Sequence, residues 1–114
     1  MMIYEIRTYR FHPGKMAAWM EVYERHGHPV LVGHVGEPLC SGVSEAGQLN
    51  EFVQVFQYAS FDDRDRRRSA MLADPLFRDY MKRSAPLEAM QSQHNQILRP
   101  AFGAPVTTPP VPAS

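Results

Sequence analysis

Phe52-Val53-Gln54-Val55-Phe56-Gln57-Tyr58 is the stretch that decides the fold of this chain. Its aromatic and β-branched residues predict a β-strand. Side chains alternate across a strand, so Val53 and Val55 share one face. The aromatic residues at positions 52, 56 and 58 share the other face with Gln54. Because both faces are apolar, we expect this strand to be covered on two sides.

Three further strands are expected around it. Residues 2–11 are rich in aromatic and β-branched types, and residues 39–45 join strand 52–58 through a hairpin turn at 46–50. Residues 87–98 form the last strand. In the first strand Tyr4, Ile6 and Thr8 point one way, and the residues on the opposite face are Glu5, Arg7, Tyr9 and Phe11.

Two helical regions separate the strands. The first begins after His12-Pro13-Gly14-Lys15 and carries an apolar stripe of Met16, Trp19, Met20 and Tyr23. Gly27 and Pro29 predict its end near His26. In the second region Asp62 is the expected N-cap, Asp74-Pro75 restarts the helix, and Pro86 ends it.

The order strand–helix–strand–strand–helix–strand predicts an α+β, ferredoxin-like βαββαβ fold with a four-stranded antiparallel sheet. Two helices can cover only one face of that sheet. We expect the other face to present Tyr9, Phe11, Phe52, Phe56 and Tyr58. An exposed patch of this size favours pairing with a second copy about a two-fold axis, so the chain is expected to be a homodimer.

Composition narrows the class of protein further. The 114 residues fit one domain at 1–102, followed by a Pro-rich tail at 103–114. Twelve basic and twelve acidic residues give a net charge of +0, so no nucleic-acid partner is expected. With one cysteine, no internal disulfide can form. Neither a signal peptide nor a membrane span is visible, and the expected location is the cytoplasm.

Three motifs resemble the NIPSNAP family, in its bacterial type. They are Met2-Ile3-Tyr4-Glu5-Ile6-Arg7-Thr8-Tyr9 with Pro13-Gly14-Lys15, the block Asp63-Arg64-Asp65-Arg66-Arg67-Arg68 leading to Ala73-Asp74-Pro75, and Ile97-Leu98-Arg99-Pro100-Ala101. Together they cover residues 2 to about 102. The resemblance implies a dimeric α+β barrel, in which two ferredoxin-like sheets enclose a shared interior. Gln54 and Phe56 depart from the His and Trp that the family often carries there.

In such a barrel the face away from the helices lines a cavity. The expected lining residues are Glu5, Arg7, Tyr9, Gln54, Phe56 and Tyr58. Apolar and aromatic walls with a few polar groups suit a small hydrophobic or aromatic ligand. Arg7 could hold a carboxylate through charge-assisted hydrogen bonds. Alternatively, Glu5 and Arg7 simply neutralise each other.

Catalytic candidates are few. Arg7, His26 and Tyr58 are the groups that an enzyme of this fold could use, His26 as a general base. His26 could equally be a helix-end residue that interacts with the last carbonyl groups. His26, His28 and His34 lie in a segment interrupted by Gly27, Pro29 and Gly33, so no metal site is expected. The absence of a phosphate-binding glycine motif gives no reason to expect a cofactor.

Three functions remain open on this sequence. The favoured one is a dimeric module that binds a small hydrophobic or aromatic carboxylate-like compound. The second is a cofactor-independent enzyme, a monooxygenase or isomerase, by analogy of fold. The third is a structural dimer that holds no ligand.

Overall fold

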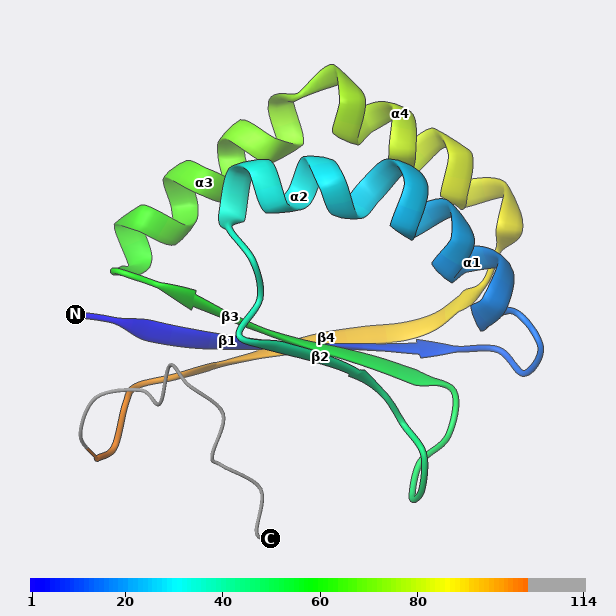
Figure 1. Ribbon diagram of the computed structural model, residues 1–114, viewed down its shortest axis with the longest axis horizontal. Coiled ribbons are helices and arrows are strands. Elements are labelled where there is room, and N and C mark those ends of the chain that lie inside the picture. The colour runs from blue at the N-terminus through cyan, green and yellow to red at the C-terminus, as the bar shows by residue number, and fades with distance from the viewer. Residues whose placement is uncertain (103–114) are drawn as a thin grey trace, which may run out of the picture.

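The computed structural model describes residues 1–102, and the predicted tail at 103–114 lies outside them. Four strands form one antiparallel sheet in the order β2-β3-β1-β4. Their bounds are β1 Ile3–Phe11, β2 Cys40–Val43, β3 Glu51–Tyr58 and β4 Met90–Leu98. The helices all lie over one face of this sheet, and the other face is open (Figure 1). The predicted ferredoxin-like α+β fold is confirmed.

The long strand β3 has the burial pattern that alternation requires. Its buried residues are Phe52, Gln54, Phe56 and Tyr58, and the residues between them are only partly buried. On β1, Ile3 and Phe11 are buried on the same side. Phe11 lies 4.9 Å from Trp19 of the first helix, measured between ring centroids, so this is the side that the helices cover.

The assignment of the two faces from the sequence was therefore wrong, although the grouping of residues was right. Phe52, Phe56 and Tyr58 lie under the helices instead of on the open face. Cross-strand partners then place the partly buried residues Tyr4, Ile6, Thr8, Val53 and Val55 on the open face. Larger aromatic side chains lie under the helices because they fill the space between the two layers.

The first helical region is longer than the sequence predicts. It comprises α1 (Met16–Val22), a π-helical segment (Tyr23–Gly27) and α2 (His28–Val35). Gly27 and Pro29 do not end the helix, because Pro29 lies in the first turn of α2, where a missing N–H costs little. The run ends at Gly36, whose φ of 84° is favourable for glycine.

The second region divides as expected into α3 (Phe61–Ala73) and α4 (Pro75–Ser84), followed by a 3₁₀ turn (Ala85–Leu87). Asp74 caps α4 by accepting from the Leu76 N–H at 2.9 Å. The start of α3 differs from the prediction. Its N-cap is Ser60 instead of Asp62, and the Ser60 hydroxyl accepts from the Asp63 N–H at 3.0 Å. In return the Asp63 carboxylate accepts from the Ala59 N–H at 3.0 Å.

An aromatic cluster joins the two layers. Trp19 stacks on Tyr23 with 5.0 Å between ring centroids, and both rings contact Phe52 of the sheet. Tyr80 of α4 packs edge-on against Tyr23. Within residues 1–102 no helix is long and apolar enough to cross a bilayer.

Candidate ligand-binding site

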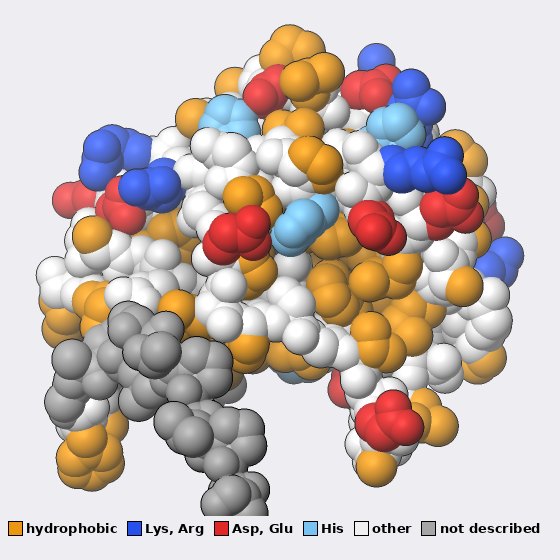
Figure 2. Space-filling view, in the orientation of Figure 1, with side chains coloured by type: hydrophobic (Ala, Val, Ile, Leu, Met, Phe, Trp, Pro, Cys, Tyr) orange, Lys and Arg blue, Asp and Glu red, His pale blue; other side chains and the backbone are white. Residues whose placement is uncertain are grey.

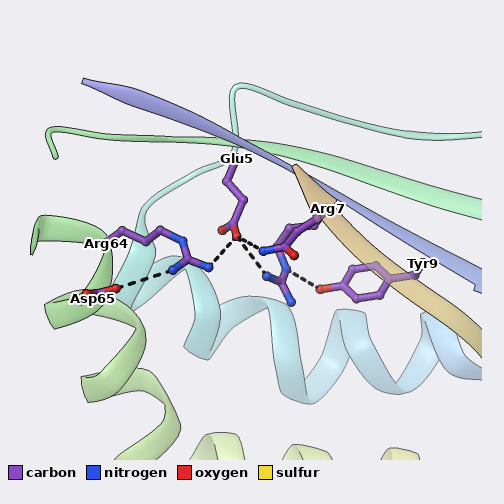
Figure 3. Close-up of polar contacts among 6 residues, drawn as sticks. Glu5, Arg7, Tyr9, Arg64 and Asp65 are labelled. Atoms are coloured by element: carbon purple, nitrogen blue, oxygen red, sulfur yellow. Dashed lines mark hydrogen bonds and ion pairs between the residues drawn. The ribbon is translucent and has the colours of Figure 1, made fainter. Parts of the chain in front are cut away.

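A buried carboxylate lies near the middle of the covered face. The Glu5 side chain is fully buried, and its Oε2 accepts from Arg64 Nη2 at 2.7 Å and from Asn95 Nδ2 at 2.6 Å. Arg7 Nη1 approaches the same oxygen at 3.3 Å, while Arg7 Nε donates to the Tyr9 hydroxyl at 2.9 Å. Figure 3 shows Glu5 between the two guanidinium groups, with Arg7 reaching on toward Tyr9.

Three elements bring these groups together. Glu5 and Arg7 are two residues apart on β1 and share its covered face, and Asn95 lies opposite Arg7 on β4. Arg64 extends from the first turns of α3, where it also pairs with the exposed Asp65 at 3.6 Å. A carboxylate in this setting needs cationic partners, because burial of an unpaired charge is costly.

The pKa of Glu5 reflects that balance. Burial raises the pKa of the carboxyl, but the hydrogen bonds from Arg64 and Asn95 and the charges of Arg7 and Arg64 outweigh burial. The pKa therefore lies below its ordinary value, and Glu5 is a carboxylate at neutral pH. For Arg7, burial lowers the pKa, and Tyr9 and Glu5 more than compensate.

This cluster has spare hydrogen-bonding capacity. Among the residues that the structure describes, the buried side-chain atoms without a protein partner are Glu5 Oε1, the Tyr58 hydroxyl and Arg64 Nε. Burial raises the pKa of Tyr58, and the charge of Glu5 adds to that rise against the opposing effect of Arg68 and Arg64. Buried polar groups ordinarily have partners, so Glu5 Oε1 and the two other atoms leave unused hydrogen-bonding capacity within the cluster itself.

A cavity of about 240 Å³ opens beside Arg7, between the sheet and the helices. Its apolar wall is formed by Leu31, Met71, Leu72, Phe77, Tyr80 and Met81. Its polar groups are Arg7, Tyr9, Arg68 and Gln93. Burial raises the pKa of the Tyr80 phenol, which therefore stays protonated at neutral pH. The cavity combines an aromatic and aliphatic wall with two guanidinium groups.

Cationic charge exceeds anionic charge around this cavity. Arg7 and Arg64 share the carboxylate of Glu5. Arg68 lines the cavity and forms no ion pair within residues 1–102. Of the two guanidinium groups that line the cavity, Arg7 shares the carboxylate of Glu5 with Arg64, and Arg68 has no carboxylate partner in residues 1–102, which favours an anionic ligand.

The structure brings together part of the set predicted from the sequence. Glu5, Arg7 and Tyr9 are joined by hydrogen bonds on the covered face. The rings of Phe56 and Tyr58, on the same face, stack on each other with 6.5 Å between their centroids. The prediction that these residues line a cavity on the side away from the helices was wrong, because that side of the sheet carries Ile6, Val53 and Val55 instead.

Gln54 belongs to a different part of the core. It lies opposite Arg7 in the register of β1 and β3, and its amide oxygen accepts from the Tyr23 hydroxyl at 3.1 Å. Its amide nitrogen points to Ser41 on β2, at 3.4 Å. It therefore contributes to a second cavity, next to the π-helical segment.

His26 lies apart from Arg7 and Tyr58. It belongs to the π-helical segment in the middle of the helical run, near Asp79 of α4. The hydrogen bond from Arg83 lowers the pKa of the Asp79 carboxyl, and His26 makes a smaller contribution. His34 instead contacts Asp74 at 2.8 Å, and His28 contacts the Tyr23 hydroxyl at 3.4 Å. In the described part of the chain no three His, Cys, Asp or Glu side chains gather as metal ligands would.

Arg64, Arg68 and Asn95 are not among the site residues predicted from the sequence. The run from Asp62 to Arg68 has interleaved charges, which ordinarily indicate a solvated helix face. Arg64 and Arg68 are one helical turn apart and share the face that meets the sheet. Their spacing is the signal that could have identified them. Asn95 has no such signal, because its role depends on the register of β4 against β1.

A larger depression, of about 650 Å³, is a surface groove lined in part by Met2, Gly36 and Tyr58. Its one cationic lining residue, Arg67, is already bound to Asp63 at 2.8 Å, and Glu37 adds a second acidic group to the lining. With no free cation for an anionic ligand, this groove is a weaker candidate than the cavity beside Arg7.

Comparison with known proteins finds relatives in sequence and in structure. The chain is 33% identical over 97 residues to the NipSnap homolog of Dictyostelium discoideum, a match that covers 80% of this chain and 40% of that protein. A NIPSNAP family protein of unknown function from Agrobacterium tumefaciens is 35% identical, with a TM-score of 0.82 over 91% of this chain and 92% of that one. The chain thus spans less than half of the Dictyostelium protein and nearly all of the bacterial one.

More distant structures share the fold alone. A Chloroflexus aurantiacus protein, provisionally named an antibiotic biosynthesis monooxygenase, superimposes with a TM-score of 0.52 at 17% identity, over 90% of this chain and 98% of that one.

The family model for NIPSNAP matches residues 4–105, which is most of the chain. This chain belongs to the NIPSNAP family.

Proposed function

We propose that this protein binds a small hydrophobic or aromatic carboxylate in the cavity beside Arg7. The observation that carries the proposal is the pair of guanidinium groups, Arg7 and Arg68, in a cavity of otherwise aliphatic and aromatic lining. A guanidinium recognises a carboxylate with two parallel hydrogen bonds, and the apolar wall suits a ring or a short chain. The site lies between helices and sheet, not between two sheets.

The geometry favours binding over the enzymatic alternative, a cofactor-independent monooxygenase or isomerase. General-base catalysis at neutral pH needs a group in the cavity whose pKa is close to 7. The raised pKa of Tyr80 keeps that phenol protonated, and His26 does not line the cavity. The remaining alternative, a dimer without a ligand, is opposed by the 240 Å³ cavity and its excess of positive charge.

We also infer that the molecule is a homodimer that pairs through the open face of the sheet. Helices cover one side only, and the centre of the open side presents Ile6, Val53 and Val55. Arg10 and Glu51 form an ion pair at 3.2 Å toward one end of this face. An apolar centre with a paired polar edge suits contact with the same face of a second copy.

The ligand proposal is tested with benzoate as the probe, by titration calorimetry on the full chain. Replacing Arg68 by Gln removes a charge that forms no ion pair within residues 1–102, so folding is preserved and affinity falls about tenfold. Arg7→Met gives a similar loss.

Arg25→Gln is the matched control, because Arg25 is exposed and its one ion pair within residues 1–102 is with Glu21. Benzoate affinity that is equal in the wild type, Arg68→Gln and Arg25→Gln variants would contradict the proposal.

A further inference from the structure

The second cavity, of about 260 Å³, lies between the helical run and the edge strand β2. Met20, Tyr23 and Phe52 form its apolar wall. In Figure 2 hydrophobic side chains gather below the front helices and above the β2–β3 hairpin, bordered by histidine and acidic side chains. This cavity and the one beside Arg7 share no lining residue.

A directed chain of hydrogen bonds runs along this cavity. Tyr23 donates its only hydroxyl proton to Gln54 Oε1 at 3.1 Å, and burial raises the pKa of Tyr23 to about 12, so that proton is retained. His28 Nδ1, 3.4 Å from the phenol oxygen, must then be the donor in that contact. Gln54 Nε2 donates onward to Ser41 Oγ at 3.4 Å.

The direction of this chain defines the chemistry at its two ends. With Nδ1 as the donor, a neutral His28 presents Nε2 as an acceptor. Ser41 Oγ accepts from Gln54, so its own proton is available to donate. In residues 1–102 no protein group uses either His28 Nε2 or the Ser41 proton. Both residues line the cavity, which thus offers one acceptor and one donor.

Among the hydrogen-bonded side chains, Gln54 is the one that a purely structural role explains least well. Its side chain is 1% exposed, at a position where its neighbours on the covered face are Phe52 and Phe56. A buried amide costs free energy unless each of its polar atoms has a partner. Tyr23 and Ser41 supply those partners, and together the three side chains hold fixed polarity at the cavity wall.

The cavity also selects by charge. No lysine or arginine lines it, and Glu24 lies at its rim. A carboxylate ligand would be repelled by Glu24, because no cationic residue of the lining compensates. A neutral molecule would not be repelled. The preference is opposite to that of the cavity beside Arg7.

We propose that this cavity is a second, separate binding site for a small uncharged aromatic or aliphatic molecule that carries one donor and one acceptor, such as a primary amide or an alcohol. Its polar group donates to His28 Nε2 and accepts from the Ser41 hydroxyl. Its apolar part packs against Met20, Tyr23 and Phe52. The site stands independently of the carboxylate site.

The test uses benzamide as the probe and the full chain labelled with ¹⁵N. Titration is expected to shift the backbone amide of Ser41 and the side-chain amide of Gln54. Ser41→Ala and His28→Phe each remove one hydrogen bond and weaken benzamide binding about threefold to tenfold. Ser69→Ala, on the exposed side of α3, leaves it unchanged. Ser41 is exposed on the edge strand, so its replacement does not endanger folding.

Benzoate separates the two sites. It is expected to perturb Gln93 and the residues around Arg7, and to be insensitive to Ser41→Ala. Benzamide that binds with equal affinity to the wild type and both variants overturns the second site, as does benzamide that shifts only the residues around Arg7. A failure of benzoate alone bears on the carboxylate site and leaves the benzamide result as support.

Discussion

At the scale of single residues, Glu5 is the group on which the covered face depends most. Its carboxylate lies between Arg64 and Arg7 with no exposed surface. We expect Glu5→Gln to lower the free energy of unfolding by about 3–5 kcal/mol, because a fully buried carboxylate is lost and two partly buried cations lose their counter-charge. Urea unfolding measures this change. Glu21→Gln is the control: it breaks an exposed pair with Arg25 and costs under about 0.5 kcal/mol. Equal costs for the two variants would contradict the assignment.

The same residue predicts a dependence on pH. The pKa of Glu5 is lower in the folded protein than its ordinary value of 4.5, so the folded state binds fewer protons than the unfolded chain between the two values. The stabilisation by Glu5 is fully present above pH 4.5 and is lost as the pH falls through the folded-state pKa. The difference in unfolding free energy between wild type and Glu5→Gln should therefore shrink below pH 4.5 and stay constant above it.

At the scale of elements, the π-helical segment sets how closely α4 approaches the first helical run. A Cβ at Gly27 would lie 2.8 Å from ring atoms of both Tyr23 and Tyr80. We expect Gly27→Ala to lower the free energy of unfolding by about 1–2 kcal/mol, because overpacking outweighs the gain in helix propensity. Gly33→Ala, in α2 with nothing within 4 Å, should raise it by about 0.5–1 kcal/mol. Thermal unfolding of both variants decides the matter, and a stabilised Gly27→Ala would refute the close packing.

At the scale of the whole molecule, the uncovered side of the sheet predicts the oligomeric state. Val55 lies opposite Ile6 near the middle of that side. A charge there would be buried in a dimer but solvated in a monomer, so Val55→Arg should dissociate the dimer without unfolding the chain. Sedimentation equilibrium should give twice 13.0 kDa for the wild type and 13.0 kDa for the variant. Ser69→Arg, on the exposed side of α3, should remain dimeric, and a wild-type mass of 13.0 kDa would rule the dimer out.

Much of the fold is readable from the sequence because it depends on local chemistry. Alternation in residues 52–58 identifies a strand and groups its side chains correctly, and Asp74-Pro75 marks the start of α4. Local signals also mislead where a longer-range arrangement compensates. Gly27 and Pro29 predict a helix end, yet packing of Tyr23 and Tyr80 over Gly27 stabilises a continuous run.

The candidate sites were decided by the tertiary structure. The sequence by itself determined the order of elements, the sharing of faces by Glu5, Arg7 and Tyr9, and the family resemblance. Only the packing of helices on the sheet decided which face is covered, because a period of two is the same for either side. Arg64 and Arg68 join Glu5 and Arg7 from a helix nearly sixty residues away, and strand register aligns Asn95 with Arg7. Such contacts depend on long-range geometry, and no local pattern encodes them.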